Sequence, residues 1–273
     1  MLNYKYRINS VFFDRIFNLY FFFYLLYNKF GDFMLYTSTS NKFIKEVKKL
    51  TDKKYRDKTD LFLVEGEHLI IEAYEKGFLT KAILKEGLTL DINFNCDSAT
   101  DNVLNYISEM KNTTCIGICK KKQGIITGDK ILILDGIQDP GNLGTIIRSC
   151  VAFNINTIIL SPDSVDVYNP KVVRATQGMI FNINILYLPI VNEINKLKNT
   201  GYKIYGTKVT GGESLSNFEI DKKFAIIMGN EGKGVSDSIL NMCDKYIYIP
   251  MKNNVESLNV AIATSIILYE LGD

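Results

Sequence analysis

The chain has 273 residues, of which 47% are hydrophobic and 23% are charged, and its formal net charge is +2 at neutral pH. This composition is typical of a globular protein with a buried core and excludes a disordered chain, and the length fits one large domain or two ordinary ones. The nearly balanced charge gives no global indication of a nucleic-acid partner.

The first unusual segment is an uncharged run rich in aromatic residues, residues 16–28. It is shorter than the roughly 20 residues that cross a bilayer, and no small-residue cleavage site follows it. Three interpretations stay open: a membrane-touching anchor, an additional helix, and translated sequence upstream of the true start. We favour Met34 as the functional start. We therefore expect residues 1–33 to be an apolar extension outside the functional protein, with no stable membrane partner.

Residues 34–120 have the pattern of a small α/β domain. Apolar residues at helical spacing predict helices over 41–50, 67–76 and 99–110, and short apolar runs predict strands over 61–64, 82–84 and 113–119. Ser40 or Asn41 is a suitable cap for the first helix. The polar segment 121–129 contains two glycines and is predicted to be a linker.

Basic residues gather in residues 41–60, where eight Lys or Arg accompany four acids, and again at Lys120, Lys121 and Lys122. Such clusters are either solvated helix faces or surfaces that contact phosphate, and the pattern alone does not decide between them.

The five cysteines and the single histidine indicate no metal site. Cys115 and Cys119 form a C-x3-C pair with no second pair and no histidine nearby. We therefore expect no metal, no disulfide framework, and reduced thiols in the cytoplasm. His68 falls in an amphipathic helical pattern and is predicted to lie on the helix surface.

A second α/β domain is predicted over residues 130–273. Short apolar strands over 131–134, 157–160, 203–206, 224–228 and 246–249 alternate with helices over 143–152, 171–177, 192–198, 236–241 and 257–271. This alternation predicts a parallel sheet, and the continuous apolar run of the first strand is typical of a strand buried on both faces.

The segment 135–148 follows the first of these strands. Pro140 and Gly141 predict a turn, and Asn142 is expected to cap a helix that starts at Leu143, which places Arg148 about two turns further on. Open α/β folds bind ligands where such a helix begins at the carboxyl end of a parallel strand.

The segment 229–234 also follows a strand, and its glycines allow the backbone to approach a ligand closely. A nucleotide-binding P-loop is excluded, because Ile227 stands where that motif needs glycine and Gly234 where it needs Ser or Thr. A third segment ends a strand at Ile249, and Ser257 is expected to cap the last helix. Each segment alone is also explained by an ordinary turn and cap.

Taken together and in this order, the three segments resemble the signature motifs of the SpoU/TrmH branch of the SPOUT RNA methyltransferases. The resemblance covers residue 130 to the C-terminus. Upstream, residues 48–56 and 62–66 resemble the substrate-binding domain of many members, which is similar to ribosomal protein L30e.

The resemblance implies an α/β fold: a parallel-sheet SPOUT domain with a C-terminal trefoil knot, preceded by the small L30e-like domain. It implies a homodimer that uses S-adenosyl-L-methionine to methylate a ribose 2′-hydroxyl in RNA, with 23S ribosomal RNA as the favoured substrate. Two alternatives stay open, a transfer-RNA 2′-O-methyltransferase and a non-catalytic RNA-binding protein on the same scaffold.

The resemblance also assigns residues. The positions that match the cofactor-binding residues of the family are Thr207, Gly229, Ile249 and Leu258. Those that match its catalytic residues are Asn142, Arg148, Glu231, Ser257 and Asn259. Those that match its RNA-binding residues are Lys54 and Arg56. Because an arginine is always protonated, we prefer for Arg148 a role in holding phosphate over that of a base. Glu231 is expected to organise Arg148 or Asn142.

Overall fold

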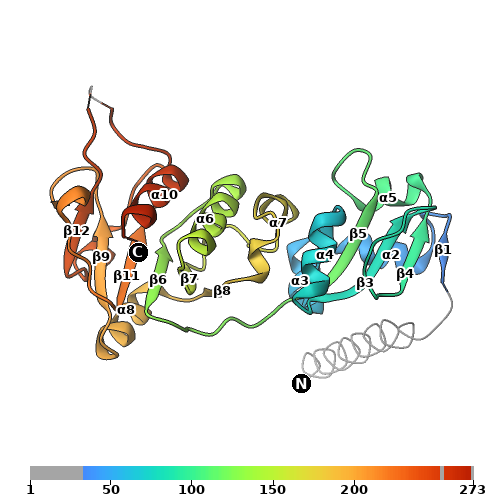
Figure 1. Cartoon of the computed structure of the whole chain (residues 1–273), viewed down its shortest axis with the longest axis horizontal. Helices are drawn as coiled ribbons and strands as arrows, with labels where there is room; N and C mark the ends of the chain where they lie inside the picture. Colours follow the sequence, from blue (N-terminus) through green and yellow to red (C-terminus); the bar gives the residue numbers. More distant parts are fainter. Residues whose placement is uncertain (1–32, 253–254, 272–273) are drawn as a thin grey trace, which may run out of the picture. The chain divides into compact units, whose positions relative to one another are not determined.

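The computed structural model describes residues 33–252 and 255–271 (Figure 1). Its internal contacts divide the chain into two compact units, with the boundary in the sequence between Lys121 and Lys122. Apart from Phe33, the predicted extension 1–33 lies outside the described residues. Within the described ranges, no helix combines the length and apolarity that a membrane crossing requires.

The first unit contains a five-stranded sheet in the order β1-β4-β3-β5-β2, in which β5 runs antiparallel to β2 and β3. Its elements in chain order are β1 (Leu35–Tyr36), α2 (Lys42–Lys49), α3 (Lys53–Thr59), β2 (Leu61–Glu65), α4 (Glu67–Glu75), β3 (Leu79–Lys85), β4 (Cys96–Ala99), α5 (Asp101–Ile107) and β5 (Cys115–Lys120). The predicted helices and strands are therefore confirmed in kind, and His68 is exposed on α4 as expected.

The elements that sequence reasoning missed carry little apolar pattern. α3 is polar along almost its whole length, β1 has two residues, and β4 consists of three small residues and one aspartate. Because β4 ends at Ala99, the helix predicted from residue 99 begins only at Asp101.

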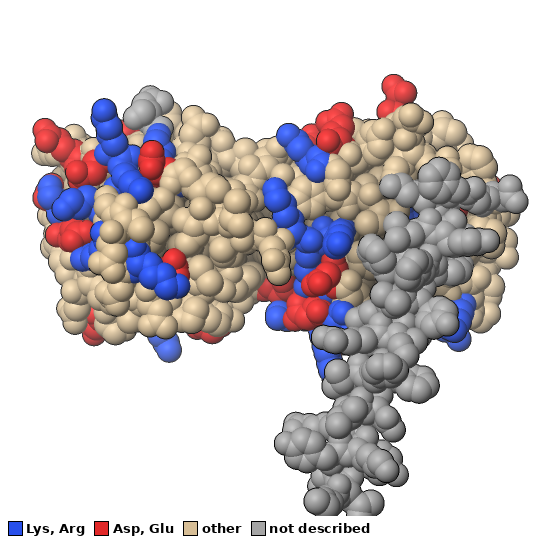
Figure 2. All heavy atoms as spheres, turned by 90° about the horizontal axis from the view of Figure 1, so that it is seen from below, with Lys and Arg blue, Asp and Glu red and all other residues tan. Residues whose placement is uncertain are grey.

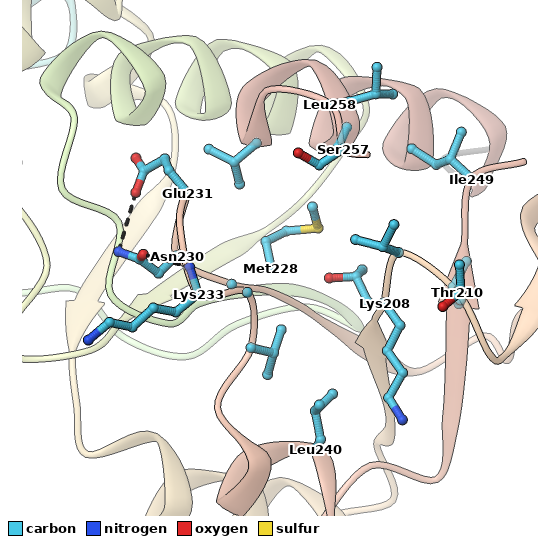
Figure 3. A pocket seen from close by; sticks show the side chains of 18 of the residues that line it. Lys208, Thr210, Met228, Asn230, Glu231, Lys233, Leu240, Ile249, Ser257 and Leu258 are labelled. Carbon is cyan, nitrogen blue, oxygen red and sulfur yellow. Dashed lines mark hydrogen bonds between the residues drawn. The ribbon is translucent and has the colours of Figure 1, made fainter. Parts of the chain in front are cut away.

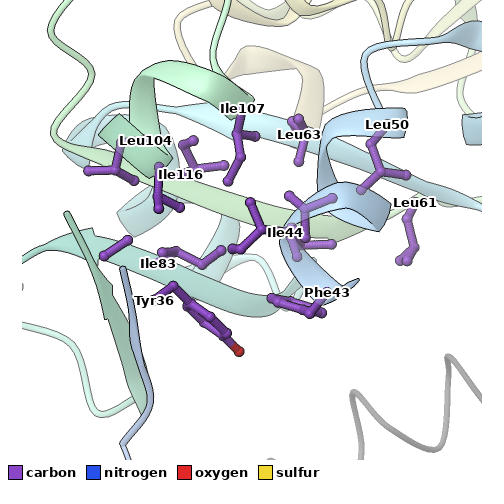
Figure 4. Packing of buried hydrophobic residues seen from close by; sticks show 14 residues of the cluster. Tyr36, Phe43, Ile44, Leu50, Leu61, Leu63, Ile83, Leu104, Ile107 and Ile116 are labelled. Carbon is purple, nitrogen blue, oxygen red and sulfur yellow. The ribbon is translucent and has the colours of Figure 1, made fainter. Parts of the chain in front are cut away.

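The core of this unit lies between α2, α5 and the sheet (Figure 4). Phe43 and Ile44 of α2 are buried against strand residues that include Ile83 and Ile116. Asn41, not Ser40, caps α2, because its Oδ1 accepts from Phe43 N at 2.9 Å and Ile44 N at 3.3 Å. The cap sets where the helix begins and so which face meets the sheet.

Arg56 requires a correction, because it is 2% exposed and cannot present its charge to RNA. Its Nη1 donates to the carbonyl oxygens of Leu50 at 2.9 Å and Thr51 at 2.7 Å, at the end of α2. Arg56 therefore fastens α3 to α2. Lys54 lies two residues earlier on another face of α3 and is exposed.

The second unit is a seven-stranded parallel sheet in the order β10-β12-β9-β11-β6-β7-β8, which confirms the predicted parallel sheet. Its elements are β6 (Lys130–Leu134), α6 (Pro140–Ala152), β7 (Thr157–Leu160), α7 (Pro170–Ala175), β8 (Asn184–Tyr187), α8 (Ile190–Asn199), β9 (Lys203–Thr207), β10 (Glu213–Ser214), β11 (Phe224–Met228), α9 (Asp237–Leu240), β12 (Lys245–Tyr248) and α10 (Val260–Leu271). The edge strands β8 and β10 were not predicted, because β8 is only half-buried and β10 has two residues.

The order of the strands positions the site. From β6 the chain continues outward to β7 and β8 on one side, and then returns to β9 and β11 on the other side of β6. In open parallel sheets this reversal leaves a crevice at the carboxyl ends of the strands, where ligands bind. The trefoil knot that the resemblance implies stays a prediction.

Helices cover both faces of this sheet. Ile190, Ile194 and Leu197 of α8 pack on alternate strand residues such as Ile131 and Ile133. α6 contacts both α7 and α10 (Figure 1). A β-carbon on Gly144 of α6 would lie 2.3 Å from the β-carbon of Ala175, so α6 and α7 cross closely. Because α6 also contacts α10, the two helices that carry the first and third segments lie side by side.

Candidate active site

A pocket with a volume of about 650 Å³ lies at the carboxyl ends of β9, β11 and β12 (Figure 3). Its volume is in the range of small-molecule sites. The walls come from the residues that follow these three strands and from the start of α10, and the apolar lining includes Met228, Leu240 and Ile267. All of the residues expected to bind the cofactor line it, namely Thr207, Gly229, Ile249 and Leu258.

The loop after β11 is closed on itself. The backbones of Asn230 and Gly234 pair with N–H to O distances of 3.0 and 2.9 Å, and Asn230 Oδ1 accepts from Gly232 N at 2.9 Å and Lys233 N at 3.2 Å. A β-carbon on Gly229 would lie 2.0 Å from the carbonyl carbon of Gly234. Only glycine at position 229 permits this closed loop.

Asn230 also joins the second segment to the first, a role that sequence reasoning missed. Its Nδ2 donates to the carbonyl oxygen of Gly136 at 2.7 Å, and Ser236 N donates to Asp135 Oδ2 at 3.0 Å. The signal for Asn230 was an asparagine directly after a glycine in a turn, since its side chain readily bonds to the following backbone.

Both predicted helix caps were wrong. α6 begins at Pro140, and Asp139 caps it by accepting from Asn142 N at 2.7 Å. Proline fits the first helical position, so the helix begins three residues earlier than expected. α10 is capped by Asn259 in place of Ser257, because Asn259 Oδ1 accepts from Ala261 N at 2.9 Å. Asn142 and Asn259 therefore lie near the first turns of two neighbouring helices.

A chain of side-chain hydrogen bonds connects the three segments. Asn142 Nδ2 donates to Glu231 Oε1 at 3.1 Å, and Asn259 Nδ2 donates to Asn142 Oδ1 at 2.9 Å. These residues are 89 and 117 positions apart along the chain. Since a carboxylate can only accept, Glu231 determines which way the Asn142 amide points.

Glu231 lines the pocket and accepts further hydrogen bonds from the first segment. Backbone N–H groups of Gln138 and Asp139 donate to its carboxylate at 3.4 and 3.3 Å. Partial burial alone would raise the pKa of Glu231, but the hydrogen bonds from Asn142 and from the backbone outweigh it and lower the pKa. Glu231 is therefore a permanent anion at neutral pH. The hydrogen bond from Asn142 is in keeping with the organising role expected of Glu231 toward Asn142, whereas no hydrogen bond or ion pair joins Glu231 to Arg148.

Ser257 and Arg148 lie outside this chain of bonds. Ser257 lines the pocket. Arg148 is exposed on α6, six residues beyond Asn142, and does not line the pocket. In the described part of the chain its guanidinium makes no hydrogen bond or ion pair. The next residue, Ser149, is tied to α10 by a 2.7 Å hydrogen bond between its Oγ and that of Ser265.

The arrangement suits a cofactor that is held by backbone groups and apolar contacts. Gly229, Gly232 and Gly234 line the pocket with backbone alone, and Ile249 and Leu258 line it with apolar side chains. Across residues 33–252 and 255–271, no cluster of three His, Cys, Asp or Glu could hold a metal ion.

Comparison with known families matches both parts of the chain. Residues 129–269 match the model of the SpoU rRNA Methylase family, and residues 41–116 match that of the MRM3-like substrate binding domain. The chain is 35% identical over 241 residues to the 23S rRNA (guanosine(2553)-2′-O)-methyltransferase RlmP of Bacillus subtilis, which covers 86% of this chain and 97% of the relative.

Solved structures agree with these matches. An AdoMet-bound rRNA methyltransferase from Sinorhizobium meliloti superimposes with a TM-score of 0.79 at 29% identity, covering 88% of this chain and 97% of that one. The structure of an RNA 2′-O ribose methyltransferase gives a TM-score of 0.75 at 26% identity and covers 87% of this chain and 97% of that one.

Proposed function

The chain belongs to the SpoU rRNA methylase family, and we propose that it transfers a methyl group from S-adenosyl-L-methionine to a ribose 2′-hydroxyl of 23S ribosomal RNA. As a member of this family it is an RNA 2′-O-methyltransferase. The observation that carries the proposal is the chain of hydrogen bonds Glu231–Asn142–Asn259, which joins all three segments beside a pocket of suitable size. The similarity to RlmP, which extends over both units, favours 23S RNA over transfer RNA.

We assign cofactor binding to the pocket. Thr207, Gly229, Ile249 and Leu258 surround it, and the S. meliloti relative is described with AdoMet bound. When bound, the cofactor supplies an electrophilic methyl group. A ribose hydroxyl is a weak nucleophile, so the tasks of the protein are to align it and to accept or redirect its proton.

Arg148 is assigned to the RNA. An exposed guanidinium with no partner among the described residues can hold a phosphate through two hydrogen bonds and so align the ribose. The other possibility, that Arg148 removes the hydroxyl proton, requires a neutral guanidinium, which is disfavoured. Glu231, Asn142 and Asn259 position the loops, and Ser257 offers a hydroxyl at the pocket wall.

We assign substrate binding to residues 34–120, with 121–129 as linker and 130–273 as the methyltransferase domain. The match of residues 41–116 to a substrate binding domain supports this division. The exposed Lys54 stays a candidate for phosphate contact in this domain. A cytoplasmic location is in keeping with the five cysteines, all of which are free thiols.

A homodimer is supported by α10. Ile262, Ile266 and Tyr269 are 54%, 38% and 70% exposed, and their spacing places them on one side of the helix. Exposed apolar stripes of this kind mark protein contacts, and a second copy of this chain is the proposed partner. Ile266→Lys should convert a dimer to a monomer in light scattering, whereas a wild-type monomer would refute the dimer.

The function is tested with purified protein, radiolabelled S-adenosyl-L-methionine, and either 23S RNA or transfer RNA, followed by mapping of the 2′-O-methyl position. We expect 23S RNA to be methylated. Arg148→Ala should reduce turnover by about 100- to 1000-fold, because the ribose is no longer aligned. Cofactor affinity, measured by calorimetry, should stay within a factor of about two, because Arg148 does not line the pocket. Methylation of transfer RNA alone, or cofactor binding with no methylated RNA, would establish one of the two alternatives.

A further inference from the structure

The loop after β11 carries a lysine, Lys233, for which the proposed function has no role. Lys233 lines the pocket, and its side chain is exposed. Figure 3 shows the side chain extending away from Met228, on the side of the pocket where Asn230 lies. Within the described residues the ammonium group has no hydrogen bond and no ion pair. It is a free positive charge at the rim of the site.

The backbone of Lys233 is held firmly. Its N–H donates to Asn230 Oδ1 at 3.2 Å, and the pairing of Asn230 with Gly234 closes the loop around it. Asn230 Nδ2 anchors the same loop to the carbonyl oxygen of Gly136 in the first segment, at 2.7 Å. Because the loop is already ordered, a ligand that binds Lys233 has to order only the side chain.

The other charged groups of the pocket are engaged elsewhere or carry the opposite sign. Lys208 also lines the pocket, but its Nζ lies 3.6 Å from the centre of the Tyr246 ring, in a cation–π contact. The Glu231 carboxylate accepts from Asn142 and from backbone N–H groups, and no ion pair joins it to Lys233. Asp237 lines the pocket without pairing with Lys233.

We propose that Lys233 binds an RNA phosphate next to the ribose that is methylated. The inference rests on the proposed function, since the target ribose has to reach both the cofactor pocket and α6. The loop of Lys233 stands where these two parts meet, bonded to the first segment through Asn230 and Glu231. A flexible ammonium group is well suited to phosphate, which it binds as a point charge.

A carboxylate on the cofactor is the competing anion, and the two differ in measurable ways. A lysine that binds a phosphate releases a counterion from the RNA. Loss of this contact should therefore make the negative slope of log affinity against log salt concentration shallower by about 0.7 to 0.9. Loss of a contact to the cofactor would change cofactor affinity and leave that slope as it was.

The experiment compares full-length Lys233→Ala, Lys233→Arg and the control Lys222→Ala, an exposed lysine that does not line the pocket. Affinity for transcribed 23S RNA is measured by filter binding at several salt concentrations, and cofactor affinity by calorimetry. We expect Lys233→Ala to bind RNA about tenfold more weakly with a reduced salt slope and unchanged cofactor affinity, and Lys233→Arg to retain RNA affinity.

Two results overturn the proposal. Weaker cofactor binding with unchanged RNA binding would assign Lys233 to the cofactor, and behaviour equal to that of Lys222→Ala would make it a solvated lysine. Failure of the wild-type protein to methylate 23S RNA would instead refute the proposed function. Normal wild-type methylation with unaltered RNA binding by Lys233→Ala would refute only the role of Lys233.

Discussion

Replacing Arg56 by alanine should destabilise the first unit, whereas the same change at Lys54 should not. Arg56 is 2% exposed, and its guanidinium donates to two carbonyl oxygens at 2.9 and 2.7 Å. Hydrogen bonds to charged groups contribute about 1.5 to 3 kcal/mol each, so the loss of both removes about 3 kcal/mol or more of unfolding free energy. Lys54 is exposed, and its replacement should change stability by less than about 0.5 kcal/mol.

Calorimetry and hydrogen exchange of the full chain measure this difference. For a unit of this size, about 1 kcal/mol shifts the melting temperature by about 4 to 8 °C, so Arg56→Ala should melt at least about 12 °C below the wild type. Faster amide exchange should be concentrated in α2 and α3, which Arg56 joins. Arg56→Lys should be intermediate, because an ammonium group cannot reproduce the guanidinium geometry.

RNA affinity, measured below the transition, completes the comparison. Lys54→Ala should bind RNA more weakly with a smaller salt slope, and folded Arg56→Ala should bind like the wild type. If Arg56→Ala melts within about 1 °C of Lys54→Ala while its RNA affinity falls, Arg56 reaches the RNA and the structural role argued for it is wrong.

Three further predictions concern the pocket. Glu231→Gln should slow methylation while leaving cofactor affinity largely intact. The reason is that the glutamine amide can donate as well as accept, so it no longer fixes the orientation of the Asn142 amide. Equal single-turnover methylation rates for wild type and Glu231→Gln would refute this prediction. Because the pKa of Glu231 is lowered in the folded protein, the ionised carboxylate should contribute a constant amount to the free energy of unfolding at every pH above its ordinary pKa of 4.5. This contribution should decline as the pH falls through the lowered pKa. A difference in unfolding free energy between wild type and Glu231→Gln that varies between pH 6 and 8 would contradict the prediction. Gly229→Ala should abolish cofactor binding in calorimetry, because the added β-carbon would lie 2.0 Å from the backbone of Gly234. The control is Gly232→Ala, whose β-carbon would meet only Asn230 at 3.6 Å. This control should bind the cofactor at least about tenfold more tightly than Gly229→Ala.

Local sequence patterns were sufficient for the order and kind of most elements. The apolar runs that became β6 and β11 are buried along nearly their whole length, and the glycine- and asparagine-rich segments after them do form the turns that the residues predict. The conformation of a turn depends on residues that are adjacent in the chain, so it can be predicted from the sequence. The pocket residues Thr207, Gly229, Ile249 and Leu258 were predicted from the resemblance to a family, in which the position of Thr207 belongs to a further loop outside the three segments.

Cap positions were harder, because several polar residues near each helix start could serve. Asp139 and Asn142 both suit a cap, as do Ser257 and Asn259, and side-chain preference does not rank them. The structure selects Asp139 and Asn259. This choice leaves the side chain of Asn142 available to Glu231 and Asn259.

What the sequence determined by itself is therefore the chemistry present and the local shape of the backbone: an α/β chain with three polar turns that follow strands. Only the tertiary structure decided that Arg56 is buried while Lys54 is exposed, and that Glu231, Asn142 and Asn259 meet across more than 80 intervening residues. The physical reason is that a periodic pattern specifies the conformation of a segment, whereas burial and pairing depend on which distant segment packs against it.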